Sequence, residues 1–319
     1  MNNFFILYII NKWIIYIINF PKQLEQEILE HTLSKFRDDN SRTVVINSVW
    51  YTGDYHQQVM QELRELCPTH IIVVAMLDPP VVKLEWFNEL NCEVIGVGYY
   101  SNSNVDYFAK FMDRFYQMPN CNLLNELIID TAYMCLNRKP HPHRLRLYQG
   151  LENAGILDSG FVSMGGIPPM RLLDNDVEGQ NFAPNGGIEQ YGIGNDIASL
   201  GNINRWQRHF VNIVTETIYD VDACNFLSEK TFKPILGLRP FFIYAPNGGV
   251  ECLKCRGFEP YVNDFNDIVD TDLIQPYNVV EFLRVLSGQP KSYWQMKFCQ
   301  LKEKLIHNKE HFTNYVRQL

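Results

Sequence analysis

The sequence Phe226-Leu-Ser-Glu-Lys-Thr-Phe-Lys-Pro-Ile-Leu-Gly-Leu-Arg-Pro240, continued by the apolar run Phe241-Phe-Ile-Tyr244, is the most informative stretch of this chain. It predicts a short helix that ends near Gly237, followed by a buried strand. Ser228 is suited to the N-cap position of this helix. A helix followed by an apolar strand is typical of an α/β domain, which presents polar side chains to a ligand at one edge of its sheet.

The first turn of the predicted helix carries Glu229 and Lys230. Backbone N–H groups without helical partners and the positive end of the helix dipole favour an anion at such a position. Lys230 can add its own charge to the binding of a diphosphate, and Glu229 can accept hydrogen bonds from a ribose diol. Lys233 and Arg239 are further candidates for contacting the anion. We therefore interpret the segment as part of a nucleotide-sugar site.

The motif Ser228-Glu229-Lys230, the apolar helix, Gly237, Pro240 and the strand resemble the donor-binding signature of the α-1,3-fucosyltransferase family. Two upstream segments are similar to other parts of the same donor domain. Phe210-Val-Asn-Ile-Val-Thr-Glu-Thr217 resembles the strand that precedes the signature, and Cys135-Leu-Asn-Arg-Lys-Pro-His-Pro-His-Arg-Leu-Arg-Leu-Tyr-Gln-Gly-Leu151 resembles the start of the domain.

The resemblance spans about residues 135–260 and implies a glycosyltransferase that moves a sugar from a nucleotide diphosphate to a glycan hydroxyl. GDP-fucose is the first candidate donor, and no metal or other cofactor is expected to be obligatory. The donor-binding residues that the resemblance implies, with Arg144 on the phosphates, are Arg144, Thr215, Glu216, Ser228, Glu229 and Lys230. Two alternatives stay open: a catalytically silent nucleotide-sugar-binding protein of the same fold, and an enzyme of similar architecture that uses a UDP-sugar.

Two series of apolar strands alternating with helices predict an α/β fold with two Rossmann-like domains facing a central cleft, the GT-B glycosyltransferase architecture. The prolines in residues 137–143 suggest the boundary, which gives an acceptor domain over 21–137 and a donor domain over 138–319. Strands are predicted at 43–50, 70–76, 92–98, 160–163, 209–214 and 241–244. Helices are predicted at 21–36, 56–66, 105–116, 122–136, from 144 onward, 229–236, 278–287 and 291–308.

A catalytic base is expected in the N-terminal domain, because transfer to a hydroxyl requires removal of its proton. Asp78 and Asp54 each follow a predicted strand, and ligands gather at the carboxyl ends of parallel strands. The resemblance implies a carboxylate in this domain without assigning one. Glu85 and His56 are the next candidates.

Composition excludes some classes of protein. The chain has 319 residues and a net charge of −8, so it lacks the excess of basic residues that nonspecific nucleic-acid binding requires. Its 8 cysteines are scattered, which favours a reducing, cytoplasmic compartment. Residues 4–20 are almost wholly apolar but shorter than a spanning helix and interrupted by Lys12. They are expected to form a peripheral extension over residues 1–20, with membrane association as the less favoured alternative.

Several other motifs have simpler interpretations. Cys252 and Cys255 form a lone C-x-x-C pair, whereas a structural zinc site needs four ligands. His141 and His143 lie in the predicted linker, where a solvated surface position is commoner than contact with a phosphate. Residues 166–205, rich in Gly, Asn and Pro, are longer than an ordinary connection and are expected to be a lid, an acceptor-binding element or an insertion without a role.

Overall fold

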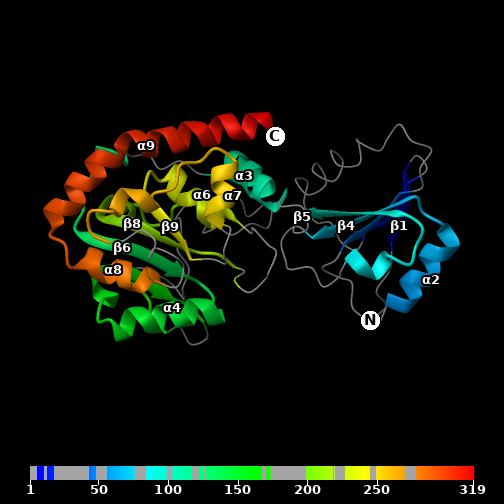
Figure 1. Cartoon of the computed structure of the whole chain (residues 1–319), viewed down its shortest axis with the longest axis horizontal. Coiled ribbons are helices and arrows are strands. Elements are labelled where there is room, and N and C mark those ends of the chain that lie inside the picture. Colours follow the sequence, from blue (N-terminus) through cyan, green and yellow to red (C-terminus); the bar gives the residue numbers. More distant parts are fainter. Residues whose placement is uncertain are drawn as a thin grey trace. The chain divides into compact units, whose positions relative to one another are not determined.

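The computed structural model divides the chain into two compact units, Met1–Tyr107 and Phe108–Leu319, each built from helices and a mainly parallel sheet (Figure 1). It describes residues 6–10, 13–17, 43–47, 56–75, 84–98, 103–116, 122–125, 127–166, 170–173, 199–217, 219, 227–244, 249–269 and 278–319. The predicted α/β class is therefore confirmed for the described residues.

The first unit contains a sheet with the strand order β1-β2-β3-β4-β5. Strand β1 is antiparallel to β2, and the remaining neighbours are parallel. Its elements are β1 (Ile6–Ile10), β2 (Trp13–Ile17), β3 (Thr43–Asn47), α2 (His56–Leu66), β4 (His70–Ala75), η3 (Leu84–Phe87) and β5 (Glu93–Gly98). Apolar residues of β3, α2, β4 and η3 form its core, and the three strands and the helix predicted in this region are confirmed.

The N-terminal segment, predicted to be a peripheral extension, contributes two strands to the edge of the first sheet. Strands β1 and β2 pair over Ile6–Ile10 and Trp13–Ile17, and β2 adds to the edge of β3. β-branched isoleucines dominate both strands, and such residues suit a pleated, half-buried surface. Among the helices that the structure describes, none has the length and apolar character needed to cross a bilayer. The helix predicted at 21–36 lies outside the described residues.

The second unit contains four parallel strands in the order β7-β6-β8-β9. They are β6 (Thr131–Asn137), β7 (Gly160–Met164), β8 (His209–Thr215) and β9 (Phe241–Tyr244). The chain moves from β6 to β7 in one direction and then crosses β6 to continue through β8 and β9 in the other. The strand order therefore reverses between β6 and β8, which is the topological switch point where α/β sheets bind ligands.

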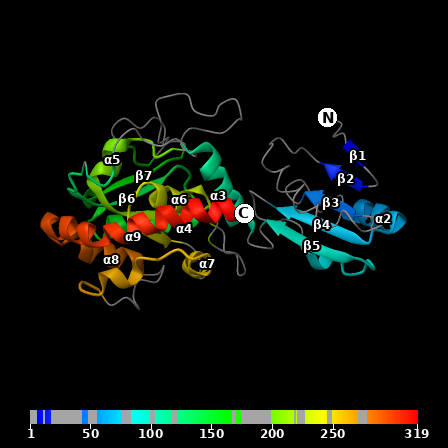
Figure 2. The same ribbon diagram turned by 90° about the horizontal axis from the view of Figure 1, so that it is seen from above.

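Helices cover both faces of this sheet (Figures 1 and 2). Right-handed connections that run in opposite directions place their helices on opposite faces. Accordingly, α4 (Pro142–Asn153) and α8 (Val279–Ser287) lie on one face, and α6 (Glu229–Leu236) and α9 (Lys291–Gln318) on the other. The remaining helices are α3 (Ser103–Phe115), α5 (Ile203–Arg208) and α7 (Gly249–Cys255), with the 3₁₀ turns η4 (Leu157–Ser159) and η6 (Val262–Phe265).

The prediction of a helix over 122–136 is wrong, because Thr131–Asn137 is strand β6 at the centre of the second sheet. Ala132, Tyr133 and Met134 favour or tolerate a helix in isolation, yet all three are buried between neighbouring strands and the helices on both faces. Since β6 belongs to this sheet, the second unit begins at Phe108 and not after residue 137.

Gly165 fixes the segment that leaves β7 against the end of β6. Its N–H donates to the carbonyl of Asn137 at 2.7 Å, and a Cβ built on Gly165 would overlap the carbonyl oxygen of Arg138. The obstacle is backbone, which cannot rotate away as a flexible side chain could. Glycine is therefore required where the two strand ends meet.

Replacing Gly165 by alanine should lower the free energy of unfolding by about 1–3 kcal/mol, the usual cost of inserting an atom into a closely packed region. Urea denaturation measures the change. Gly288→Ala is the matched control, because its added Cβ would lie 3.5 Å from the nearest neighbouring atom, an ordinary contact distance. Equal stability of the Gly165 variant and the control would show that the two segments do not approach as described.

Candidate functional site

Polar side chains meet at the carboxyl ends of β6, β7 and β8. The Thr215 hydroxyl at the end of β8 donates to Asn137 Oδ1 at the end of β6, with a distance of 2.5 Å. The backbone N–H of Asn137 in turn donates to Ser163 Oγ near the end of β7 at 3.3 Å. These bonds join three strand ends at the switch point, so this edge is the candidate ligand site.

Glu216 follows β8 directly, and its carboxylate is fully buried at the N-terminus of α6. Its Oε1 accepts hydrogen bonds from Ser228 N–H at 2.9 Å and from the Thr231 hydroxyl at 2.7 Å. Its Oε2 accepts from the Ser228 hydroxyl at 2.5 Å. A buried carboxylate is stable only with such donors, and the positive end of the α6 dipole also favours it.

Ser228 is the N-cap of α6, as predicted, and its hydroxyl oxygen accepts from Lys230 N–H at 3.4 Å and from Lys230 Nζ at 3.2 Å. Lys230 Nζ also forms an ion pair with Glu229 Oε1 at 2.7 Å. Burial alone would raise the pKa of Glu229, but Lys230 and Lys233 outweigh it and hold that pKa below its usual range. Glu229 and Lys230 therefore form a charged pair fixed by the helix cap.

The N-terminus of α6 differs in one respect from the sequence-based expectation of free N–H groups for an anion. The N–H groups of Ser228 and Lys230 bond to Glu216 and to the Ser228 hydroxyl, and Thr231 N–H bonds to the Ser228 carbonyl at 3.1 Å. The Glu216 carboxylate already lies at the N-terminus of α6, where a bound anion was expected. A ligand phosphate at this edge would have to rely on side-chain cations.

Arg144 and His143 on α4 attach that helix to the end of β8. Arg144 NH2 donates to the carbonyls of Thr215 at 3.0 Å and Glu216 at 3.3 Å, and NH1 donates to the Lys139 carbonyl at 3.3 Å. His143 Nε2 lies 2.8 Å from the Glu216 carbonyl. The side chain of Arg144 is buried, which lowers its pKa, and among the described residues its Nε has no partner. Its bonds hold the backbone, whereas its predicted contact with a phosphate stays a prediction.

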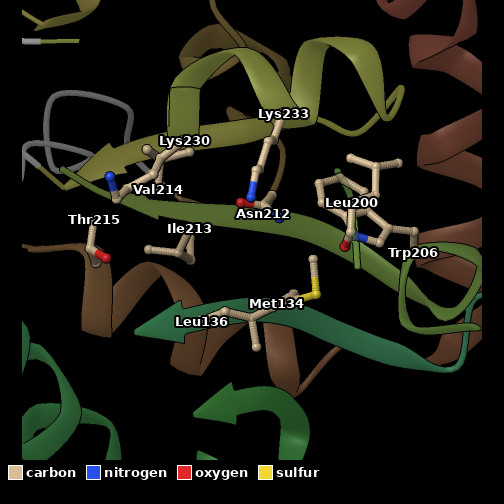
Figure 3. A pocket seen from close by; sticks show the side chains of 10 residues that line it. All are labelled: Met134, Leu136, Leu200, Trp206, Asn212, Ile213, Val214, Thr215, Lys230 and Lys233. Atoms are coloured by element: carbon tan, nitrogen blue, oxygen red, sulfur yellow. The ribbon is translucent and has the colours of Figure 1, made fainter. Parts of the chain in front are cut away.

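A small open pocket of about 80 Å³ lies between α6 and the sheet (Figure 3). Figure 3 shows Lys230 and Lys233 extending from α6 toward β8, above the apolar Met134 and Leu136 of β6. The lining is completed by Leu200, Trp206, Asn212, Ile213, Val214 and Thr215. Because the pocket is lined by Thr215 at the end of β8 and by Lys230 in the first turn of α6, the pocket and the polar edge adjoin.

The structure brings together all six donor-binding residues that the resemblance implies. Arg144, Thr215, Glu216, Ser228, Glu229 and Lys230 all lie at the carboxyl edge of the switch point. Asp54 and Asp78, the candidate bases, lie outside the described residues, as does most of the 166–205 stretch. His56 begins α2, and Glu85 is exposed on η3.

Arg239 does not take part in this site. It is fully buried, and its guanidinium donates to the carbonyls of Leu123, Trp206 and His209 while it lies over the Phe298 ring. It is a structural residue and not a helper for the phosphates. Cys252 is buried and Cys255 exposed, and the described residues contain no cluster of His, Cys, Asp or Glu that could hold a metal.

Asn137 and Thr231 belong to the site but carry little signal in the sequence. The sequence predicts a helix up to residue 136 and a linker from Asn137, so it does not indicate that Asn137 ends a strand. Thr231 resembles any polar residue of a helix first turn, and only the tertiary fold brings Glu216 to its hydroxyl. The position of Asn137 at the end of an apolar run was the one signal that could have found it.

Comparisons with protein-family models, with curated proteins and with solved structures find no significant match to this chain.

Replacing Glu216 by glutamine should destabilise the second unit by about 3 kcal/mol, because the amide group cannot accept all three hydrogen bonds and leaves buried donors unpaired. Urea denaturation measures the global change, and hydrogen–deuterium exchange of residues 227–236 measures the local one. Exchange there should become faster.

Glu281→Gln is the matched control, because Glu281 lies on the surface of α8 and, within the described part of the chain, pairs with Arg284 alone. Its stability and its exchange in α6 should equal those of the parent protein. Unchanged exchange in the Glu216 variant would contradict the capping role.

Proposed function

We propose that the protein is a glycosyltransferase that uses a nucleotide diphosphate sugar, with GDP-fucose as the first donor to test and a glycan as acceptor. The observation that carries the proposal is the Glu229–Lys230 pair at the N-terminus of α6, beside the strand ends where the sheet order reverses. Open α/β sheets bind nucleotides at this position. The resemblance to the α-1,3-fucosyltransferase signature includes the same two residues.

Lys230 is suited to the departing diphosphate. An ammonium group has three N–H donors, and described residues use two of those of Lys230, through Ser228 Oγ and Glu229 Oε1. The side chain is 31% exposed, so a ligand can reach the third. In the transfer, the acceptor hydroxyl oxygen bonds to the sugar carbon and gives its proton to a base, while the bond from that carbon to the diphosphate oxygen breaks with its electron pair. A nearby fixed cation stabilises the negative charge that develops on the diphosphate.

Glu229 is suited to the ribose. The charge of Lys230 keeps its carboxylate ionised, and the ion pair fixes its direction. An ionised carboxylate is an acceptor only, which matches the two hydroxyls of a ribose diol. The adjoining pocket offers apolar surface from β6 and cations from α6, a combination suited to a ligand that joins a phosphate to a less polar group.

Binding of GDP, UDP, CMP and ADP, measured by thermal shift and calorimetry, tests the donor class. Lys230→Ala should weaken GDP binding roughly 10- to 100-fold, because a hydrogen bond to a charged group contributes about 1.5–3 kcal/mol. Glu229→Gln should weaken GDP but leave pyrophosphate nearly unaffected, since only GDP carries a ribose.

The control for both variants is Lys302→Ala, which removes one positive charge from α9. GDP bound without transfer of fucose to any glycan would favour the silent binding protein, and preference for UDP would redirect the donor assignment. If no nucleotide binds, or if Lys230→Ala binds GDP as the parent does, the proposal is wrong.

A further inference from the structure

Basic side chains gather where β6 passes into α4. This segment, called here the basic turn, comprises Arg138, Lys139, Pro140 and His141. Arg138 and Lys139 are exposed, and His141 is half-buried as the N-cap residue of α4. The turn therefore places two exposed basic side chains and a titratable imidazole at the carboxyl end of β6.

The backbone of the basic turn is held in place. His141 N–H and Arg144 NH1 both donate to the Lys139 carbonyl, at 3.0 and 3.3 Å. Gly165 packs directly on the Arg138 carbonyl, which fixes the other end of the turn. Groups held before a ligand arrives lose less conformational entropy on binding it, so the turn is suited to recognition.

A chain of contacts connects the basic turn to Lys230. The rings of His141 and His143 stack with their centroids 5.9 Å apart, and His143 Nε2 lies 2.8 Å from the Glu216 carbonyl. The Glu216 carboxylate holds Ser228, whose hydroxyl contacts Lys230 Nζ at 3.2 Å. Basic groups from α4 and from α6 thus approach the same sheet edge.

Like charges dominate the surroundings of His141. Burial and then the charges of Arg144, Lys139 and Lys230 lower its pKa. Among the described residues, two carboxylates at this edge are already engaged, Glu216 with Ser228 and Thr231, and Glu229 with Lys230. The described ionisable groups around the imidazole include Lys139 on its own segment, His143 and Arg144 on α4, Glu216 and Tyr219 after β8, and Glu229 and Lys230 at α6.

We propose that the basic turn and Lys230 together bind the phosphate groups of the ligand, and that His141 binds them in its protonated form. An anion placed among these cations removes their mutual repulsion, which is the physical reason for the site. These side-chain cations would bind the anion in place of the α6 N-terminus, where Ser228 N–H already donates to Glu216 and Lys230 N–H to the Ser228 hydroxyl. The inference rests on the proposed function in taking a diphosphate as the ligand.

Proton uptake distinguishes this site from a simple basic surface. In the free protein His141 is mainly neutral at pH 7, because burial and neighbouring cations lower its pKa from the ordinary value. A bound phosphate favours the imidazolium and raises that pKa, so binding takes up a proton. Affinity should therefore rise as the pH falls from 8 toward 6, beyond any change due to the ligand's own ionisation.

Calorimetry of the full chain with inorganic pyrophosphate at pH 6 and pH 8 tests the proposal. Lys139→Ala should weaken binding roughly tenfold, the effect of one charge-assisted hydrogen bond. His141→Asn should bind like the parent at pH 8 but lose the gain in affinity at pH 6. The ligand's own ionisation is the same in both titrations and cancels in this comparison. Lys302→Ala controls for the loss of charge, and circular dichroism confirms that each variant folds.

The inference is overturned if pyrophosphate does not bind. It is also overturned if pyrophosphate binds Lys139→Ala and His141→Asn as tightly as it binds the parent at both pH values. GDP binding and fucose transfer in the same variants separate it from the proposed function. Pyrophosphate bound through the basic turn without any nucleotide preference would support the phosphate site while contradicting the nucleotide-sugar assignment. Transfer that proceeds with unchanged GDP affinity in both variants would support the enzyme and contradict the phosphate site.

Discussion

The buried carboxylate of Glu216 is the interaction on which the rest of the second unit's candidate site depends. Glu216 follows β8 directly, its carboxylate caps α6 through Ser228 and Thr231, and its backbone carbonyl contacts His143 and Arg144 of α4. One residue thus fixes a strand and two helices that lie on opposite faces of the sheet. A buried charge costs free energy unless every lone pair finds a donor, so the positions of these donors are closely constrained. That constraint places Glu229 and Lys230 at the sheet edge.

The charged residues of this unit separate into two groups by burial. Glu216, Arg144 and Arg239 are buried, and their polar atoms bond mainly to backbone or to hydroxyl groups, so they determine where the chain lies. Lys230, Lys139 and His141 are partly or fully exposed and lie around the same strand ends. An exposed cation keeps its hydration, so it costs little free energy in the folded protein. Its electrostatic free energy falls most when an anionic ligand neutralises it. We infer that the first group builds the site and that the second group contacts the ligand.

The sequence predicted those features that depend on local signals. Ser228 as N-cap, Gly237 after the helix and the apolar Phe241–Tyr244 strand are each specified by neighbouring residues, and all three are confirmed. Strand β6 was predicted as a helix because its Ala, Met and Leu residues favour helix locally, whereas its two strand neighbours are distant in sequence. The occupation of the α6 N-terminus by Glu216 was missed for a similar reason. The carboxylate lies twelve residues before Ser228, and only the turn of the chain after β8 brings them together. The sequence likewise suggested Arg239 as a phosphate contact, whereas its side chain is fully buried.

A crystal structure of the full chain with GDP would locate the bound diphosphate. We expect it within hydrogen-bond distance of Lys230 Nζ and of the basic turn, with the Glu216 carboxylate still bonded to Ser228. The ribose should lie against Glu229. A diphosphate bound to the N–H groups of α6 with Glu216 displaced, or bound away from the carboxyl ends of β6 and β8, would contradict this expectation.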